Sequence, residues 1–194
     1  MYIDGLCRHL GTVDPKPLAE AIAALGDDAW DEYDFRQKAF RVHAATQTIP
    51  LLYDEDMRHT NPTTWPRFAE VESALQPVLD LIRNSYLQQG QGDGYFVRII
   101  LTRLRPLSGI PPHVDNGPSL VRSHRHHLAV ATNPKVQFLI GGKPHHFGAG
   151  EVWEINNRQQ HEVRNYSEER RVHLIADYVV PGETIHDPDG IVIA

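Results

Sequence analysis

The sequence predicts a mainly β fold, a barrel or sandwich closed on itself, preceded by helices. From residue 94 onward, short runs of β-branched and aromatic residues recur between Pro, Gly and Asn, a pattern typical of all-β domains. In the first half of the chain, apolar residues recur three and four positions apart, which is helical spacing. We therefore expect the helices to pack on the outer face of the β structure.

Two helices are expected in the first half of the chain. The first covers residues 17–25, with Asp14 as its N-cap, and its apolar residues share one face. The second covers residues 64–86, and Pro77 should kink it or split it in two. The apolar residues of the first helix are Leu18, Ile22 and Leu25, and those of the second are Phe68, Val71, Leu75, Val78, Leu79 and Ile82.

The segment 40–53 is expected to form an early strand, with Pro50 indicating a sheet edge or a bend. The glycine-rich segment 89–94 is predicted to be a turn, because it has neither the preceding strand nor the following helix of a phosphate-binding loop. The later strands are expected over residues 95–105, 124–132, 136–140, 152–155 and 171–180.

Length, charge and cysteine content restrict the class of protein. A chain of 194 residues with 41% hydrophobic content fits one domain. A net charge of −6 argues against a nucleic-acid partner. No apolar stretch approaches 18 residues and no signal peptide is visible, so we expect no membrane association. Cys7 has no second cysteine to pair with, which favours a reducing, cytoplasmic setting.

The triplet His113-Val114-Asp115 and the later His161 are candidate metal ligands. About one His-x-Asp triplet is expected by chance at this composition, so the triplet alone is weak. Residues two apart in a strand share a face, so His113 and Asp115 can point at one metal, and His161 would arrive from a distant strand. Two imidazoles and a carboxylate hold non-haem Fe(II) while leaving positions open for a cosubstrate and O₂.

A second group of polar residues falls within the predicted strands. Arg125 and His127 share one face of their strand, with His126 on the other, and Thr102 and Arg171 also lie in strand-like runs. Two guanidiniums facing a barrel interior are costly unless an anion satisfies them. A dicarboxylate would do so.

From about residue 102 to residue 180 the chain resembles the aspartyl/asparaginyl β-hydroxylase family of Fe(II)- and 2-oxoglutarate-dependent dioxygenases. The first hundred residues match only loosely. The motifs that carry the resemblance occur in the family's order: Pro112-His113-Val114-Asp115-Asn116-Gly117, His124-Arg125-His126-His127-Leu128-Ala129-Val130, Gly150-Glu151-Val152-Trp153, His161-Glu162-Val163 and Arg171-Val172-His173-Leu174-Ile175-Ala176-Asp177.

The resemblance implies a double-stranded β-helix, that is, a jelly-roll or cupin-like core. Residues 94–180 would form this catalytic core, residues 1–93 its helical and strand support, and residues 181–194 a C-terminal tail, together a single dioxygenase domain. It also implies site roles: metal binding at His113 and His161, and cosubstrate binding at Thr102, Arg125, His127 and Arg171. At Asp115 this chain departs from the animal members, which have Gly there, so a full two-His-one-carboxylate set is available.

The implied activity uses Fe(II), 2-oxoglutarate and O₂ to hydroxylate an unactivated carbon, foremost the β-carbon of an Asp/Asn-like amino acid or peptide residue. The membrane span and helical-repeat domain of the animal enzymes are missing, which favours a small-molecule, amino-acid or peptide substrate. Further candidate contacts are His43, Gln47 and Arg103 for the substrate, and Asn116, Asn157 and His173 for orienting ligands.

Two alternatives remain open. One is a non-catalytic, cupin-like protein that binds a metal or ligand, and the other is a 2-oxoglutarate oxygenase acting on another small molecule. Halogenation is disfavoured among such reactions, because Asp115 stands where a halide would need an open coordination position.

Overall fold

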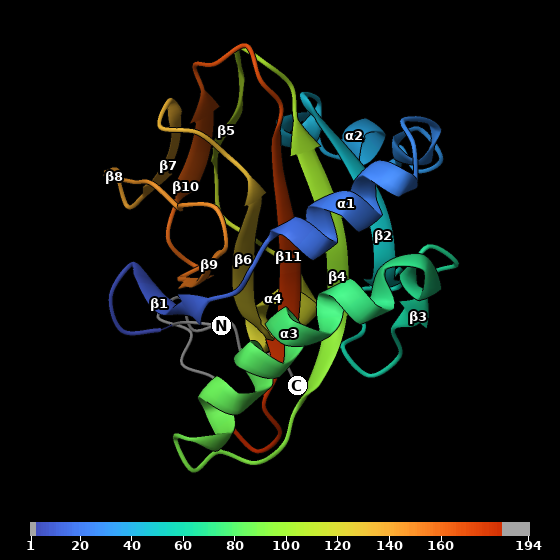
Figure 1. The fold of residues 1–194 in the computed structure, drawn as a ribbon. Helices are drawn as coiled ribbons and strands as arrows, with labels where there is room; N and C mark the ends of the chain where they lie inside the picture. Colours follow the sequence, from blue (N-terminus) through green and yellow to red (C-terminus); the bar gives the residue numbers. More distant parts are fainter. Residues whose placement is uncertain (1–2, 184–194) are drawn as a thin grey trace.

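In a computed structural model, which describes residues 3–183, the chain folds into two antiparallel sheets (Figure 1). The larger sheet has the order β1 (Cys7–Thr12), β9 (Glu151–Ile155), β6 (His124–Ala131), β11 (Arg171–Val179), β4 (Tyr95–Leu104), β2 (Thr46–Tyr53) and β3 (Thr63–Thr64). The smaller has the order β5 (Ser108–His113), β10 (His161–Asn165), β7 (Val136–Ile140) and β8 (Lys143–His145). The predicted mainly β jelly-roll with N-terminal helices is confirmed.

Helices α1 (Lys16–Ala24) and α3 (Phe68–Leu87) lie across one face of the larger sheet (Figure 1). Their apolar stripes are buried in one hydrophobic cluster with that face of the sheet, as the periodicity predicts. The remaining helical segments are short: η1 (Asp28–Trp30), α2 (Phe35–Ala39), η2 (Arg41–His43) and α4 (Pro118–Arg122). No helix within residues 3–183 is long and apolar enough to cross a bilayer.

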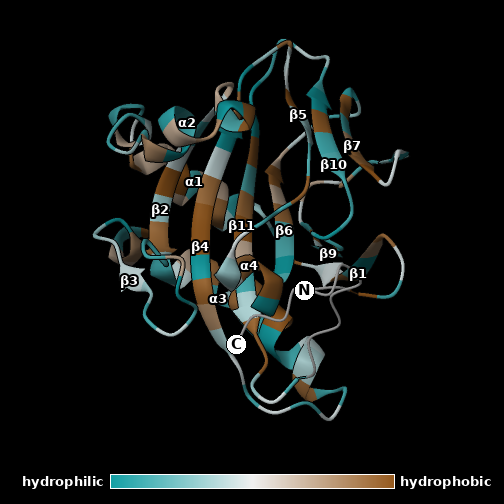
Figure 2. Ribbon diagram, turned by 180° about the vertical axis from the view of Figure 1, so that it is seen from behind, coloured by the Kyte–Doolittle hydropathy of each residue, from teal (hydrophilic) through white to brown (hydrophobic). Residues whose placement is uncertain are grey.

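Alternation of side chains along the central strands separates this helical layer from the interior between the sheets. On β4, β6 and β11, Leu101, Leu128 and Leu174 pack against the helices. Their neighbours Thr102 and His127 line a cavity on the opposite side. In Figure 2, β4 is accordingly mostly hydrophobic but interrupted by hydrophilic bands. The polar residues inside the fold are thus placed by strand parity.

In the first half two expected boundaries were wrong, and the split that was one of the two outcomes expected at Pro77 does not occur. Helix α3 runs through Pro77 without splitting, because this proline is exposed and water can satisfy the carbonyl that loses its N–H partner. The early strand begins at Thr46 rather than at residue 40, since residues 35–43 form short helices instead. Helix α3 begins at Phe68, after the short β3.

Other expectations for this region are confirmed. Pro50 lies at an irregularity in the pairing of β2 with β4, as its missing N–H suggests. Residues 88–90 form a turn and residues 91–94 have no regular structure. The predicted tail lies mostly outside the described residues, which end at residue 183.

Strands β1, β5 and β10 have no clear sequence pattern. Strand β5 contains Pro111 and Pro112, which cannot donate to a ladder, and it lies at the edge of the smaller sheet, where that is tolerated. β1 and β2 belong to the larger sheet, so strands from the first 93 residues extend the β structure built by the second half.

Candidate functional site

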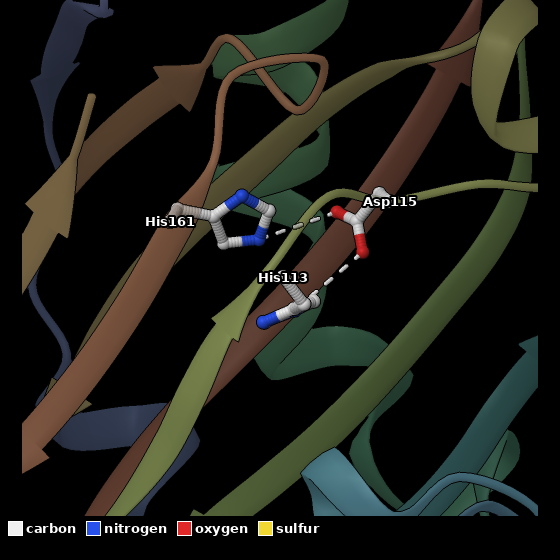
Figure 3. Close-up of side chains that lie close together, drawn as sticks. All are labelled: His113, Asp115 and His161. Atoms are coloured by element: carbon white, nitrogen blue, oxygen red, sulfur yellow. Dashed lines mark ion pairs between the residues drawn. The ribbon is translucent and has the colours of Figure 1, made fainter.

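The three candidate metal ligands lie together at one end of the smaller sheet (Figure 3). His113 ends β5, His161 begins β10, and the two are directly opposite each other in register. Asp115 Oδ1 lies 3.8 Å from His113 Nε2, and Asp115 Oδ2 lies 3.6 Å from His161 Nε2. One ligand atom of each residue falls within 4.8 Å of the others, so a single cation can contact all three.

Asp115 is not in a strand, contrary to the parity expectation. β5 ends at His113, and Asp115 follows in the loop before α4. Its backbone N–H donates to the carbonyl of Asn157 at 3.2 Å, and the Asn157 side chain donates to the Leu120 carbonyl at 3.0 Å. These bonds tie the loop to the chain segment leading to His161. The loop, rather than a shared strand face, aims the carboxylate at the two imidazoles.

Backbone carbonyls fix the tautomer of both histidines. His113 Nδ1 lies 2.9 Å from the Pro111 carbonyl oxygen, and His161 Nδ1 lies 2.9 Å from that of Gln159. A carbonyl only accepts, so each Nδ1 carries the proton and each neutral ring presents the Nε2 lone pair. Metal-binding histidines are held in this way, and burial lowers the pKa of His161, which favours its neutral form further. Two imidazole nitrogens and one carboxylate oxygen are the donor set that would hold a first-row divalent cation such as Fe(II).

Asp115 is buried and ionised. Burial by itself raises the pKa of its carboxyl, but the positive charge of Arg125 outweighs burial and lowers the pKa below its usual range. Arg125 Nη1 donates to Asp115 Oδ2 at 2.6 Å, and Arg125 Nε and Nη2 each donate to Asp177 at 2.8 Å. Arg125 therefore holds the carboxylate in place from the larger sheet.

This pairing extends deeper into the fold. Arg98 Nε lies 3.8 Å from Asp177 Oδ2, and Arg98 donates to Asp54 at 2.8 and 2.6 Å. The result is a buried chain of alternating charge that ends at the candidate metal ligand Asp115.

A narrow cavity beside the metal ligands is lined by all four residues that are expected from the sequence to bind the cosubstrate. Its volume is about 30 Å³. The four residues are Thr102, Arg125, His127 and Arg171.

Arg171 is the arginine of this group that lacks a counter-ion. It is only 2% exposed. Its Nη2 donates to His173 Nδ1 at 2.6 Å, its Nε has no partner, and no carboxylate within residues 3–183 pairs with it. Burial lowers the pKa of Arg171 to about 9, so the guanidinium is still a cation at neutral pH. A buried cation without an anion is costly, and a ligand carboxylate would relieve that cost.

The other cavity residues add neutral polar groups. Thr102 Oγ1 lies 3.4 Å from the His173 carbonyl oxygen. His127 and His173 each have a buried Nε2 without a partner, and burial together with Arg171 holds the pKa of both rings well below the usual range. As predicted, His126 points the other way, toward Tyr86.

Of the three candidate substrate contacts, the structure brings only His43 to the site. Its ring centre lies 5.8 Å from that of His113. Arg103 Nε donates a hydrogen bond to Gln47 Oε1 at 2.7 Å, and Arg103 lines a separate pocket beside Trp30. Both occupy the alternate positions of β2 and β4, which face away from the cavity.

Two further sequence candidates have other contacts. His173 supports Arg171 rather than a metal ligand, and the Asn116 side chain accepts a hydrogen bond from Arg158 at 3.0 Å. Sequence reasoning missed Arg36, which lies on α2 and lines the same cavity as Arg171. No periodic pattern marks this residue, because its helix has only five residues.

Comparison with known proteins supports a dioxygenase fold. A protein-family model described as Aspartyl/Asparaginyl beta-hydroxylase matches residues 14–181. None of the curated protein sequences matches the chain significantly.

Solved structures with similar folds share little sequence with this chain. A 2OG-Fe(II) oxygenase family oxidoreductase from Burkholderia pseudomallei has a TM-score of 0.56 and 13% identity, covering 92% of this chain and 93% of its own. A prolyl hydroxylase from Trichoplax adhaerens, solved with a hypoxia inducible factor peptide fragment, has a TM-score of 0.60 and 11% identity over 91% and 84% of the two chains. The viral collagen prolyl hydroxylase of Paramecium Bursaria Chlorella virus-1 has a TM-score of 0.54 and 8% identity over 91% and 97%.

These structural matches establish the fold, and the family match covers most of the chain. The chain belongs to the aspartyl/asparaginyl β-hydroxylase family and is a 2-oxoglutarate-dependent dioxygenase that uses Fe(II), 2-oxoglutarate and O₂.

Proposed function

We propose that this dioxygenase hydroxylates the β-carbon of an Asp/Asn-like amino acid or peptide residue. The main support for the cosubstrate site is Arg171, a buried cation that has no carboxylate partner among the described residues. It lines the same cavity as His113 and His161. A dicarboxylate with one end near those histidines and the other at Arg171 would satisfy both ends of the cavity.

In this proposal His113, Asp115 and His161 hold Fe(II). When bound, the iron supplies the oxidising chemistry that hydroxylates a carbon with O₂ and 2-oxoglutarate. The chain's own residues prepare the site: the Pro111 and Gln159 carbonyls keep both Nε2 lone pairs available, and Arg125 holds the carboxylate of Asp115 ionised.

Arg171, helped by Thr102, binds the far carboxylate of 2-oxoglutarate. Arg125 and His127 contact the near carboxylate or the substrate. Three of the five N–H groups of Arg125 are engaged by Asp115 and Asp177, which leaves two for a ligand. Because the cavity is only about 30 Å³, side chains must shift to admit the cosubstrate.

The proposal extends to the organisation of the chain. Residues 1–194 act as one dioxygenase domain in the cytoplasm, with residues 94–180 as the catalytic core and a small-molecule, amino-acid or peptide substrate. The lone cysteine, which has no disulfide partner, supports a reducing compartment.

The test is succinate formation from 2-oxoglutarate by protein reconstituted with Fe(II). We expect the wild-type chain to form succinate, and His113→Ala and His161→Ala to lose at least about 100-fold in rate, because each removes a metal ligand. His146→Ala, at an exposed histidine, is the matched control. If both ligand variants turn over as fast as the wild-type chain, the metal assignment is refuted. If the wild-type chain binds metal but forms no succinate, the non-catalytic alternative is favoured.

The position of oxidation needs a separate measurement. Aspartate, asparagine and short peptides containing them are incubated with the enzyme, and products that gain one oxygen are located by mass spectrometry and NMR. A hydroxyl on the β-carbon is the expected result. Oxidation only at other carbons would refute the β-hydroxylase assignment but not the assignment as a dioxygenase.

A further inference from the structure

A second, larger pocket adjoins the cosubstrate cavity. Its volume is about 300 Å³, at the lower end of the range for small-molecule sites. The candidate metal ligands His113 and Asp115 form part of its wall. The residues that line both spaces are Arg36, His43, His113 and Arg125. A molecule in the outer pocket would therefore lie against the metal centre.

Three guanidiniums line this pocket, and only one has no acidic partner. Arg98 and Arg125 are paired with buried aspartates. Arg36 is 6% exposed, and among residues 3–183 its guanidinium donates to Thr48 Oγ1 at 3.1 Å and to His43 Nε2 at 3.1 Å. No carboxylate in the described part of the chain forms an ion pair with Arg36.

His43 leaves the charge of Arg36 uncompensated. Because His43 Nε2 accepts a hydrogen bond from Arg36, the imidazole is neutral and holds the guanidinium in position. Burial lowers the pKa of Arg36 to about 10, so the guanidinium remains charged at neutral pH. Arg36 is thus a buried, oriented cation, and such a group is costly until an anion binds.

The cosubstrate does not account for this second cation. In the proposed arrangement the far carboxylate of 2-oxoglutarate binds Arg171, and its 2-oxo acid end binds at the metal. Arg171 lines only the inner cavity, whereas Arg36 also faces the outer pocket. Apolar side chains complete the outer pocket, among them Phe40, Val42 and Met57. The pocket therefore combines a cation that has no carboxylate partner in the described part of the chain with room for a small apolar group.

We propose that Arg36 binds a carboxylate of the substrate, and that the substrate is a free amino acid or a similarly small carboxylic acid. This inference rests on the proposed dioxygenase function. A charge-assisted, two-pronged bond from a guanidinium would orient the substrate carbon chain toward the metal centre. His43 is a positioning residue for Arg36.

The first experiment compares acids with their amides on the wild-type enzyme. The twenty L-amino acids are assayed for stimulation of succinate formation, beside the same compounds with every carboxylate amidated. We expect at least one acid to stimulate and its amide to be at least about 10-fold weaker, as expected for loss of a charged hydrogen bond. Equal stimulation by acid and amide overturns the proposal, as does no response to any acid while 2-oxoglutarate alone is turned over.

The second experiment measures binding of the stimulating acid under nitrogen, where no turnover occurs. By calorimetry with Fe(II) and 2-oxoglutarate present, Arg36→Gln should weaken binding of that acid about 10- to 100-fold, and Arg36→Lys less, since the charge remains. Arg41→Gln, at a nearby exposed arginine, should leave binding unchanged. Thermal unfolding of each variant shows whether it is folded, and the acid–amide comparison needs no variant.

The outcomes separate this inference from the function on which it rests. Absence of succinate formation by the wild-type enzyme under every condition refutes the proposed function itself. If wild-type succinate formation is normal but Arg36→Gln binds the acid as tightly as wild type, only the role of Arg36 fails. If Arg36→Gln instead weakens 2-oxoglutarate binding when no amino acid is present, Arg36 belongs to the cosubstrate site and the inference is wrong.

Discussion

Arg125 and Arg171 are both buried guanidiniums, but they differ in whether a carboxylate neutralises their charge. Arg125 has carboxylate partners on two sides, Asp115 and Asp177. Within residues 3–183, the side-chain partner of Arg171 is the neutral ring of His173. A paired buried cation holds structure in place, whereas a buried cation without a counter-ion is costly until an anion binds. The same distinction separates Arg36 from its neighbours in the outer pocket.

Replacing Arg171 by Met tests this distinction. We expect the dissociation constant for 2-oxoglutarate to rise about 10- to 100-fold, because a charged hydrogen-bond donor is lost. The free energy of unfolding without ligands should stay level or rise by about 1–3 kcal/mol, because an uncompensated buried charge is removed. Calorimetry and urea unfolding measure the two effects, with the exposed neighbour Arg170→Met as control. Unchanged affinity for 2-oxoglutarate would exclude Arg171 from the cosubstrate site.

At the scale of elements, three adjacent strands place charges side by side. Asp177 of β11 is directly opposite Arg98 of β4 on one side and Arg125 of β6 on the other. Cross-strand neighbours on one face are close enough to pair. The order of strands in the larger sheet therefore builds the buried charge chain that reaches the candidate ligand Asp115.

Asp177→Asn keeps the shape of this side chain but removes its charge. Because two buried arginines lose a partner, we expect the free energy of unfolding to fall by about 3–5 kcal/mol. Affinity for Mn²⁺, used as a probe, should fall about 10- to 100-fold, since Arg125 no longer holds Asp115 firmly. Urea unfolding and metal titration measure these effects, and Asp28→Asn at an exposed site is the control. Wild-type Mn²⁺ affinity in a folded Asp177→Asn protein would contradict the positioning role.

His126, on the opposite face of β6, predicts that the stability of the fold depends on pH. His126 lies between Tyr86 Oη of α3 at 2.8 Å and the Ala176 carbonyl of β11 at 3.1 Å, and burial lowers its pKa from 6.5 to about 4. Below pH 6.5 the unfolded chain takes up a proton that the folded chain does not. Stability should therefore fall between pH 6.5 and pH 4, with a contribution of about 3 kcal/mol from this residue.

Urea unfolding across that pH range measures the effect. A His126→Gln variant should have a flatter profile than the wild-type chain, while His9→Gln, at an exposed histidine, should follow the wild type. A profile for His126→Gln as steep as the wild-type one would show that other groups cause the pH dependence.

At the scale of the whole molecule, the site joins the two sheets. His113 and His161 lie at the ends of adjacent strands of the smaller sheet, whereas Thr102, His127 and Arg171 belong to the larger one. A ligand that touches both groups binds only when the sheets are in place. Binding to the folded state alone stabilises it by mass action.

Mn²⁺ and 2-oxoglutarate together should therefore raise the melting temperature. At about 100 times their dissociation constants, each contributes about 2.7 kcal/mol, or about 5–10 °C for a chain of this size. Differential scanning calorimetry measures the shift, and a chelator should reverse the part due to metal. Arg171→Met should keep the increment from Mn²⁺ but lose that from 2-oxoglutarate. A full 2-oxoglutarate increment in that variant would place the cosubstrate elsewhere.

Much of the fold followed from local patterns in the sequence. Periodicity of three and four residues predicted helices α1 and α3, and runs of β-branched residues predicted the central strands. Period two also placed Arg125 and His127 on one face and His126 on the other, because strand parity is a local property of the backbone. At Pro77 the sequence left a kink or a split open, and the structure excludes the split, because α3 continues through this exposed proline.

The sequence by itself determined which chemical groups are available: two histidines, a carboxylate and a set of strand arginines in an order typical of one family. Only the tertiary structure decided which of those groups are already paired. It engaged Arg125 with two aspartates, left Arg171 and Arg36 without an anion among the described residues, and aimed Asp115 from a loop rather than a strand. The reason is physical: a side chain's face is set by its neighbours in sequence, whereas its charge partners come from distant strands and short helices that only packing brings together.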